Sequence, residues 1–378
     1  MTGFIARILQ DEGFEPVLAH YEPYRLSPHL SVPSFRLLRN RVGTELRRSL
    51  DNYETHAIGA WLPELEFTHY HATTAWRQIM NSCAAHVAVA GNALAAMPFL
   101  QTGRPFLAWV ATGWAEDRKD RVLRFPWPRK LLDRLLNGPV LRHQERCVLE
   151  AGTILALSEY TRRTLDEIVG RSITAGVLPM PVDTAFFSPR PDRVMRRRIG
   201  FSGRLDDPRK NLELLLAALA RARRSGMVLT ALLIGGTPGQ AIRAQVRALE
   251  LEAQIEFTPY LSRSELRDRL RTLDVFVLPS HQEGLCIAAL EAMACGCPVV
   301  STRCGGPEEF VIDGETGVTV RFDPDEMAGA ITRIVADRAL RERLARGARR
   351  RVEEHYTRAR ARTVFWTTFN RVFPNFAK

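Results

Sequence analysis

Residues 274–317 constrain the fold more than any other part of the chain. They begin with an apolar, partly β-branched run at 275–278, which is typical of a buried parallel strand. From 284 to 295 apolar residues recur at helical spacing, and Gly296 stands where a left-handed residue would end the helix. Residues 298–301 then predict another strand. This alternation of strand, helix and strand predicts an α/β protein with a parallel sheet.

Two loops in this stretch follow strands, and both carry groups suited to a sugar nucleotide. In an open α/β sheet, ligands bind beyond the carboxyl ends of the strands, where helix N-terminal amides favour anions. Glu283 precedes the predicted helix and Glu291 lies eight residues further, about 12 Å apart if the whole span is helical at about 1.5 Å per residue. Carboxylates accept hydrogen bonds from sugar hydroxyls, so one glutamate at each end of a diphosphate suits a nucleotide sugar. A bare pair at this spacing would equally fit two solvated glutamates.

The motifs in combination are more specific than the glutamates alone. Glu283-x7-Glu291, then Gly296-x-Pro298-Val-Val and Gly305-Gly306-Pro307-Glu308, resemble the donor site of retaining GT-B fold glycosyltransferases of family 4. The resemblance implies two Rossmann-like, doubly wound α/β domains with a cleft between them. It also implies that Glu283 orients the sugar and Glu291 the ribose. The loop residues that the resemblance places against the donor are Gly284, Leu285, Cys286, Gly305 and Gly306.

A basic pair follows an earlier predicted strand at 199–203. Arg204 and Lys210 flank a turn that leads into an apolar-faced helix, and they match the basic pair of the family. Fixed cations aimed at a departing nucleoside diphosphate stabilise the charge that accumulates as the glycosidic bond breaks. Two ordinary surface cations are the alternative, although cations at a helix N-terminus oppose its dipole unless an anion comes between.

The base of the nucleotide would lie against two further strand ends. Strands predicted at 228–234 and 255–259 end in turns that hold the base in the family, and Tyr260 and Leu261 are the candidates here. An aromatic residue after a strand is as often ordinary packing. Asp323-Pro-Asp325 resembles a metal-binding D-x-D, but it precedes a predicted helix and more simply caps it. We therefore predict no metal and no cofactor, with the nucleotide-diphosphate sugar as a substrate.

The domain organisation follows from a proline-rich connector. Residues 178–192 contain four prolines, too many for a helix or a central strand, and resemble the interdomain stretch of the family. We expect an acceptor-side domain at 1–181, a nucleotide-sugar-binding domain at 182–355, and a closing helix at 356–378 that crosses back to the first domain. A chain of 378 residues is long enough for two such cores.

The N-terminal half departs from the family pattern. Residues 4–11 predict a helix and 14–19 a strand, whereas the family opens with a strand and a Gly-rich loop that faces the acceptor; neither is found here. Further strands are predicted at 56–60, 65–68, 85–89, 105–110 and 153–158, with helices near 73–83, 94–101, 131–149 and 159–168. His69-Tyr70-His71 would stand at a strand end, with packing or a backbone hydrogen bond as the alternative to a role in the cleft. No histidine follows the strand at 105–110, where the family has one.

The distribution of charge along the chain bears on the partners that the protein would bind. The net charge is +11, and residues 333–378 hold 13 Lys and Arg against four Asp and Glu. Arg349–Arg351, Arg358, Arg360 and Arg362 there suggest either acidic partners, such as anionic lipid or nucleic acid, or a solvated helix face. Residues 118–136 interleave seven basic residues with aromatic and leucine residues, which suits a membrane interface or an amphipathic packing helix. Taken with the donor site, these surfaces favour membrane contact, and we expect no nucleic-acid partner.

Six cysteines lack metal-ligand spacing, and four of them, Cys286, Cys295, Cys297 and Cys304, lie in the donor stretch. They suit packing in a reducing compartment, with a redox switch as the alternative. Charged residues interrupt what would be the apolar core of a signal peptide, and no apolar run approaches the ~20 residues that span a bilayer. We expect a cytoplasmic protein, with possible peripheral contact at the inner face of the membrane.

The sequence thus predicts a metal-independent retaining glycosyltransferase. It would move a sugar from a nucleotide-diphosphate sugar to a glycan, lipid or small-molecule acceptor, in cell-surface polysaccharide or glycoconjugate synthesis. A nucleotide-sugar binding protein without turnover is the first alternative. A glycoside hydrolase is the second, although it needs its carboxylates across a glycosidic bond and has no use for a diphosphate clamp.

Overall fold

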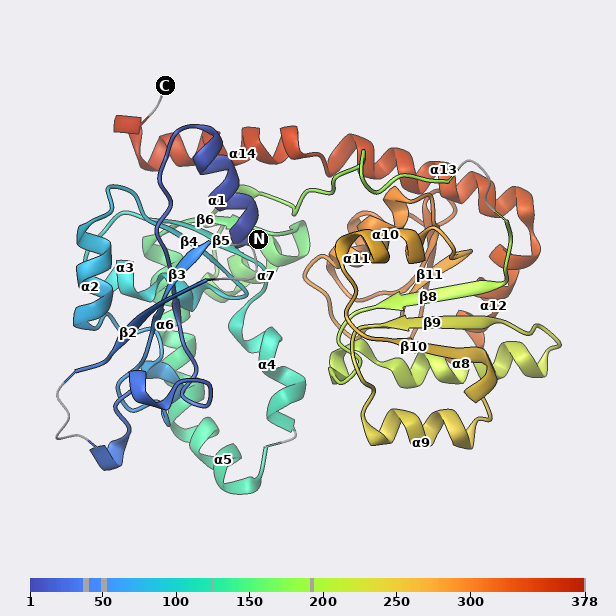
Figure 1. Cartoon of the computed structure of the whole chain (residues 1–378), viewed down its shortest axis with the longest axis horizontal. Helices are drawn as coiled ribbons and strands as arrows, with labels where there is room; N and C mark the ends of the chain where they lie inside the picture. Colours follow the sequence, from blue (N-terminus) through green and yellow to red (C-terminus); the bar gives the residue numbers. More distant parts are fainter. Residues whose placement is uncertain (37–40, 49–52, 124, 191–193, 377–378) are drawn as a thin grey trace. The chain divides into compact units, whose positions relative to one another are not determined.

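The chain divides into two compact units (Figure 1). The computed structural model describes residues 1–36, 41–48, 53–123, 125–190 and 194–376. The first unit comprises Met1–Leu178 with Arg362–Lys378, and the second comprises Pro179–Ala361. The division falls inside the proline-rich connector at 178–192, whose last part, 191 and 192, lies outside the described residues. Among the described residues, no helix has both the length and the apolar composition that crossing a bilayer requires.

The second unit is built on a six-stranded sheet in which every pairing is parallel, in the order β10-β9-β8-β11-β12-β13. The central strand β11 is apolar and buried along its length. The elements are β8 (Arg198–Ser202), α8 (Leu212–Arg224), β9 (Thr230–Ile234), α9 (Gln240–Ala248), β10 (Ile255–Thr258), α10 (Arg263–Leu270), β11 (Val275–Leu278), α11 (Ile287–Ala294), β12 (Val299–Thr302), β13 (Gly317–Val320), α12 (Pro324–Ala336) and α13 (Arg338–His355).

Helices cover both faces of this sheet (Figure 1). Helices α8, α9 and α12 pack side by side on one face, and α10, α11 and α13 pack together on the other. The apolar sides of α8 and α12 join the strands in one buried cluster. A doubly wound parallel sheet of this kind leaves its ligand site at the carboxyl edge of the strands.

The helix predicted from 284 is shorter than expected at its N-terminal end. It begins at Ile287, because Cys286 has a left-handed backbone (φ 68°) and stands outside the helix. Its C-terminal end agrees with the prediction, since Gly296 has φ 73° and follows the last turn. Asp323 caps α12 as predicted, accepting hydrogen bonds from the amides of Asp325 and Glu326.

The first unit contains two separate sheets, one in the order β1-β3-β2 and one parallel in the order β4-β5-β6-β7. The helix α14 (Arg358–Val372) reaches this unit from Arg362 onward, and Phe14 packs against its Trp366 and Phe369. The other elements are α1 (Thr2–Asp11), β1 (Leu18–Tyr21), β2 (Thr44–Arg48), β3 (Glu54–Ile58), α2 (Thr74–Asn81), β4 (Val87–Ala90), α3 (Met97–Gln101), β5 (Leu107–Val110), α4 (Trp114–Leu123), α5 (Trp127–Leu132), α6 (Gly138–Ala151), β6 (Thr153–Ala156), α7 (Glu159–Val169) and β7 (Thr174–Val177).

Three predictions for this unit need correction. The strand predicted at 65–68 is a 3-10 turn, Glu66–Thr68, which the Thr68 hydroxyl closes by donating to the carbonyls of Leu62 and Leu65. The long helix predicted at 131–149 starts earlier, at Trp127, and runs to Ala151 through a π-helical turn at Asp133–Asn137. Strands β2 and β7 were not predicted, because neither has a strong alternation of apolar and polar residues.

Candidate functional site

The candidate residues of the second unit gather at one edge of its sheet. Because all six strands are parallel, the residues that follow them share the carboxyl edge. The strand order turns back between β8 and β11, which pair directly with each other. Ligands of doubly wound sheets bind at such a switch point. Arg204 and Lys210 follow β8, and Glu283 follows β11.

A buried ion pair joins the two loops at the switch point. Lys210 Nζ lies 2.7 Å from Glu283 Oε1, and both side chains are largely buried. Ser280 Oγ donates to the same oxygen at 2.7 Å. Burial alone would lower the pKa of Lys210, but the nearby carboxylate of Glu283 outweighs it and raises that pKa. Lys210 is therefore a fixed cation, held where the two loops meet.

The second basic residue stands on the surface beside this pair. The guanidinium of Arg204 is 59% exposed and lies 2.6 Å from the carboxylate of Asp207. Asp207 also binds the side chain and the amide of Arg209. Burial opposes ionisation of Asp207, but its bonds to Arg209 prevail and lower its pKa to about 2. Asp207 is thus a permanent anion that orients Arg204 without covering it.

The loops after β11 and β12 are bound to each other through their backbones. The Glu283 amide donates to the Cys304 carbonyl, and the Gly306 amide donates to the Glu283 carbonyl. A Cβ on Gly306 would lie 2.0 Å from the carbonyl oxygen of Gly284, so only glycine allows this approach. The Gly305 amide donates to the carboxylate of Glu308. The amides of both glycines are therefore engaged within the protein.

The amides that remain available are at the start of α11. In the part of the chain that the structure describes, no acceptor is found for the amides of residues 285–288. The Leu285 side chain is buried, so this residue can meet a ligand only through its backbone. Burial raises the pKa of the Cys286 thiol strongly, which disfavours its reactive thiolate form. Unpaired amides at a helix N-terminus are suited to an anion, and these lie next to Glu283 in the chain.

Glu291 has the chemistry of a ligand-binding carboxylate. It lies in the second turn of α11, and burial raises its pKa to about 7 against the opposing charge of Arg263. Among the described residues, no donor bonds its carboxylate. The predicted separation of about 12 Å from Glu283 does not apply, because only residues from Ile287 onward are helical. A half-buried carboxylate without a partner gains from a ligand hydroxyl that donates to it.

The candidate base-binding residues follow β10 at the same edge of the sheet. The side chain of Tyr260 is 68% exposed, and its ring lies against Gly236 at the end of β9. Leu261 beside it is half-buried. An exposed ring next to a glycine turn offers a flat apolar face for stacking on a planar group.

Several residues of this site were not predicted from the sequence. Ser280 donates a hydrogen bond to Glu283, and Asp207 pairs with Arg204. The positive charge of Arg263 favours the ionised form of Glu291. Gly235 has φ 143°, and a Cβ there would lie 1.7 Å from the Gly203 carbonyl oxygen, so only glycine allows the ends of β8 and β9 to approach this closely. Two signals were available: Asp207 precedes a proline, as capping residues do, and Ser280 is the first polar residue after a buried strand.

Other predicted candidates have structural partners. The tail arginines mostly bind the chain itself: Arg349 donates to the carbonyls of Thr184, Phe187 and Ala294, and Arg362 pairs with Asp11 and Glu12. His69 follows a turn and not a strand, bonds the Pro63 carbonyl, and stacks on Tyr21. Burial lowers the pKa of His69. The histidine therefore has the packing role that was the alternative.

Comparison with known proteins agrees with the fold and with the family resemblance. Doubly wound parallel sheets commonly bind nucleotides at their switch point, which is where Arg204, Lys210 and Glu283 lie in the second unit. Residues 184–351 match the family described as glycosyl transferases group 1, and this range contains every donor-site residue predicted. Within the second unit, residues 184–351 are thus similar to group 1 glycosyltransferases, and the predicted resemblance is confirmed.

Curated relatives match over part of their length. A D-inositol 3-phosphate glycosyltransferase of Nocardiopsis dassonvillei is 32% identical over 228 residues, which are 55% of this chain and 53% of that protein. A GDP-mannose-dependent phosphatidylinositol monomannoside mannosyltransferase of Mycolicibacterium smegmatis is 34% identical over 206 residues, or 50% of this chain and 54% of that protein. The chain thus spans about half the length of these relatives.

Solved structures establish the fold of the whole chain. A sucrose-phosphate synthase from Thermosynechococcus elongatus is similar with a TM-score of 0.74 at 19% identity, covering 98% of this chain and 92% of that one. The Anabaena protein HepE, crystallised with UDP, is similar with a TM-score of 0.64 at 18% identity, covering 78% and 81%. The predicted GT-B fold of two Rossmann-like domains is confirmed.

Proposed function

We propose that the protein is a glycosyltransferase that moves a sugar, with retention of configuration, from a nucleotide-diphosphate sugar to an acceptor without a metal ion. The observation that carries this proposal is the Lys210–Glu283 pair at the switch point of the second unit. A buried lysine that stays charged is suited to a phosphate, and its carboxylate partner is suited to sugar hydroxyls. The relatives' names support this class of reaction.

Each group has a role in the proposed reaction. The free amides at the start of α11, together with Lys210 and Arg204, bind the diphosphate and stabilise its growing charge as the glycosidic bond breaks. Glu283 orients the sugar, and Glu291 accepts hydrogen bonds from the ribose. Tyr260 and Leu261 face the base. The donor's own phosphate takes the proton of the acceptor, so the protein supplies cations and no separate base.

Donor binding is tested first by thermal shift with GDP-mannose, UDP-glucose, UDP-N-acetylglucosamine and ADP-glucose. A ligand that binds only the folded protein raises its melting temperature. We expect one nucleotide sugar to stabilise the parent protein and not Glu291→Ala. The matched control is Glu145→Ala, because Glu145 is also a buried carboxylate with a raised pKa but lies in the first unit. Equal stabilisation of the parent and Glu291→Ala would overturn the assigned site.

Turnover is tested with the same donor and with inositol phosphate, phosphatidylinositol mannoside and simple glycosides as acceptors. We expect Lys210→Ala to lose turnover by a factor of about 100 or more, the scale seen when one charge-stabilising group is removed. Activity should be unchanged by EDTA, and the product should keep the anomeric configuration of the donor. Inversion or a metal requirement would refute those parts of the proposal.

A nucleotide-sugar binding protein without turnover is the second candidate. The observation in its favour is that the strands of the first unit fall into two separate sheets. In that case one donor would stabilise the protein, and Glu291→Ala would abolish the effect, but no acceptor would yield a product. The two assays together separate the two candidates.

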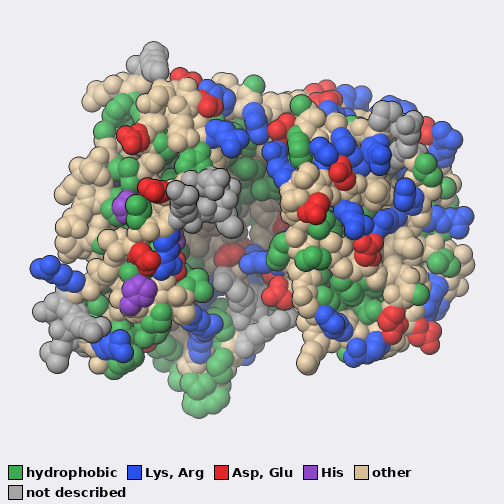
Figure 2. Space-filling model, viewed as in Figure 1, with side chains coloured by type: hydrophobic (Ala, Val, Ile, Leu, Met, Phe, Trp, Pro, Cys, Tyr) green, Lys and Arg blue, Asp and Glu red, His purple; other side chains and the backbone are tan. Residues whose placement is uncertain are grey.

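We also propose peripheral contact with an anionic membrane through α5 and the turn that follows it. Five apolar side chains in this segment are exposed: Trp127, Leu131, Leu132, Leu135 and Leu136. Three exposed cations accompany them: Arg129, Lys130 and Arg134. Figure 2 shows hydrophobic side chains gathered where Figure 1 places α5. Arg118, by contrast, is buried with Glu66 and Asp133, and Arg124 lies outside the described residues.

Membrane contact is tested by sedimentation with phosphatidylcholine vesicles, with and without phosphatidylglycerol. We expect binding only with the anionic lipid, and a loss of at least tenfold on changing both Trp127 and Leu135 to serine, since burying one such side chain contributes about 1.5–3 kcal/mol. Val228→Ser is the control, because Val228 is also exposed but lies in the second unit. Equal binding by the double variant would refute the proposed contact.

A further inference from the structure

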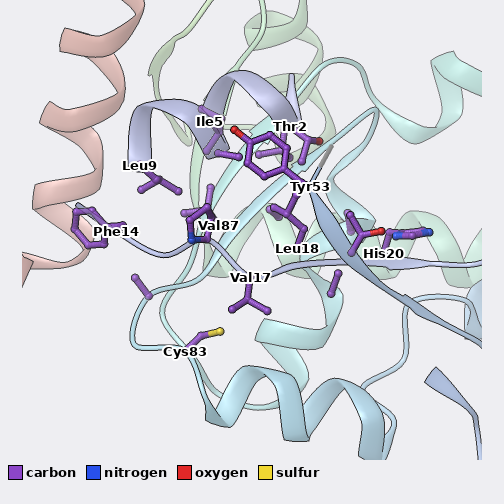
Figure 3. Close-up of a pocket in the computed structure, with 18 of the residues that line it drawn as sticks. Thr2, Ile5, Leu9, Phe14, Val17, Leu18, His20, Tyr53, Cys83 and Val87 are labelled. Atoms are coloured by element: carbon purple, nitrogen blue, oxygen red, sulfur yellow. The ribbon is translucent and has the colours of Figure 1, made fainter. Parts of the chain in front are cut away.

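A cavity of about 760 Å³ in the first unit does not suit a nucleotide. Figure 3 shows its walls, which include Ile5 of α1, Leu18 of β1 and Val87 of β4. Among the described residues that line it there is no lysine or arginine, and Glu15 adds a carboxylate. A diphosphate binds to fixed cations or to free amides, and the second unit offers both. The base of the donor is therefore expected at the second unit.

An arginine at the start of α10 stands beside the groups proposed to hold the base and the ribose. Arg263 is the first residue of α10, and one residue separates it from Tyr260 and Leu261. Its positive charge opposes the rise in the pKa of Glu291 that burial causes. Because a base is bonded directly to its ribose, a side chain that acts on the ribose-binding carboxylate is also within reach of the base.

Two aromatic rings orient the guanidinium of Arg263. Its central carbon lies over the Phe186 ring, 4.7 Å from the centroid, and over the Phe187 ring at 5.4 Å. Phe187 is buried, and the Phe186 amide donates to the Asp183 carboxylate at 3.1 Å, so this segment is itself fixed. A guanidinium that lies over a ring keeps its N–H groups at its edge. The rings therefore hold Arg263 without using its donors.

The protein leaves donors of Arg263 available to a ligand. Its side chain is 52% exposed, and in the part of the chain that the structure describes it pairs with Asp183 at 3.5 Å, beyond the usual length of a hydrogen bond. The same oxygen of Asp183 lies closer to Arg358, at 3.2 Å. A guanidinium has five N–H donors and no acceptor, so Arg263 calls for a group that presents acceptors.

Guanine, adenine and uracil differ in what they present to such a donor fork. Guanine has two neighbouring acceptors, O6 and N7, and one arginine can donate to both. Adenine has an amino group next to N7, and uracil has the carbonyl O4 next to an N–H. Of these three bases, guanine alone can therefore accept two hydrogen bonds from one arginine side by side.

We propose that Arg263 reads the base of the donor and selects guanine. The guanidinium donates to O6 and N7, while Tyr260 offers its ring to the base and Glu291 accepts from the ribose. The choice of base rests on the proposed function, because it names the nucleotide of the same donor site. Arg263 contacts the base and not the glycosidic bond, so it sets the affinity for the donor.

Calorimetric titration of the full chain with GDP, UDP and ADP tests this assignment, since the three share the ribose and the diphosphate. We expect GDP to bind at least about fivefold more tightly than the other two, the lower end of the discrimination by a bidentate pair. Two analogues locate the contact. We expect 7-deaza-GDP, which has C–H in place of N7, to bind about tenfold more weakly than GDP. Inosine diphosphate, which keeps O6 and N7 but lacks the 2-amino group, should bind as GDP does.

Three variants separate the fork of Arg263 from its charge. Arg263→Met should lose the preference for GDP over UDP and should bind GDP and 7-deaza-GDP equally. Arg263→Lys keeps the charge near Glu291 but has no fork, so it should lose the same preference. Arg267→Met is the matched control, because Arg267 also belongs to α10 and lies 4.7 Å from the centroid of the Phe186 ring. This control should keep the preference of the parent.

Two results would overturn the assignment while glycosyl transfer stands. One is a parent that binds UDP or ADP as tightly as GDP. The other is an equal loss of GDP and UDP affinity in Arg263→Met, because Arg263 would then contact the ribose or the diphosphate. In both cases the donor site still binds a nucleotide, and the product assay still reports transfer. If no nucleoside diphosphate binds, the donor site itself is refuted, and the choice of guanine with it.

Discussion

The carboxylate of Glu291 gives a prediction about pH that separates ligand binding from stability. Burial raises the pKa of Glu291 from an ordinary value of 4.5 to about 7. Between these values the folded state keeps a proton that the unfolded state has lost. The free energy of unfolding therefore falls as the pH rises from about 4.5 to about 7, by at most about 3 kcal/mol from this group, and is then constant. Glu291→Gln removes this loss, so the variant should be more stable than the parent at pH 8 and similar to it near pH 4.5.

Donor binding should depend on the same proton, but it should become stronger as the pH rises, whereas the stability of the protein falls. Ribose hydroxyls donate to the ionised form, so ligand binding requires Glu291 to lose its proton. Below pH 7 the dissociation constant of the parent should rise by about tenfold for each pH unit, and above pH 7 it should be constant. At pH 8, Glu291→Gln should bind the donor about 10- to 100-fold more weakly than the parent, because it loses a hydrogen bond to a charged group. Its dissociation constant should not depend on pH.

Glu145 provides the control for both measurements. Burial raises its pKa to about 7 as well, and its carboxylate accepts the Trp114 amide at 2.7 Å. Glu145→Gln should therefore change stability with pH as Glu291→Gln does, but it should leave the pH dependence of donor binding intact. Calorimetric titration of the nucleotide sugar that stabilises the protein, between about pH 5.5 and pH 8.5, measures this. A dissociation constant of the parent that is the same over this range would refute the assignment of Glu291 to the ribose.

Three further substitutions test other parts of the site. Lys210→Ala leaves the buried Glu283 without its cation and should lower the free energy of unfolding, measured by urea unfolding, by about 3–5 kcal/mol. The double variant with Lys210→Met and Glu283→Gln should recover this stability but should still form no product. Gly306→Ala places a Cβ 2.0 Å from a backbone oxygen and should abolish donor binding, but Gly239→Ala, with open space around it, should bind normally in the thermal-shift assay. Asp323→Ala should cost about 1 kcal/mol through loss of a helix cap and leave donor affinity unchanged; a loss of affinity would contradict the capping role.

The second unit was predictable because its strands are buried on both faces. Such strands give continuous apolar runs, and the polar residues that follow them stand out in the sequence, as Glu283 does after β11. The side chains that hold these groups in place were harder to predict. Ser280 bonds Glu283 over a separation of three residues, and Lys210 reaches it from 73 residues away. The contact between Lys210 and Glu283 depends on the pairing of β8 with β11, which local sequence patterns do not specify.

The first unit was less predictable for a related physical reason. Strand β2 has the sequence Thr-Glu-Leu-Arg-Arg, with little apolar content, and it exists through antiparallel pairing with β3. The turn at Glu66–Thr68 has a strand-like sequence but closes through the Thr68 hydroxyl. Tertiary partners decide both cases, and they outweigh weak local preferences.

The framework of the second unit is already closed without a ligand, and this bears on its function. In the donor unit the loops are closed on each other by the Glu283 and Gly306 amides, and Lys210 is already held by Glu283. The carboxylate of Glu291 and the amides at the start of α11 are the unpaired groups, and the charges of Lys210 and Arg204 are held in place by Glu283 and Asp207. A site with its framework fixed and only its ligand-facing groups unpaired loses little freedom when the ligand binds. The second unit thus suits a small polar ligand that donates hydrogen bonds to Glu291 and offers an anion to these amides.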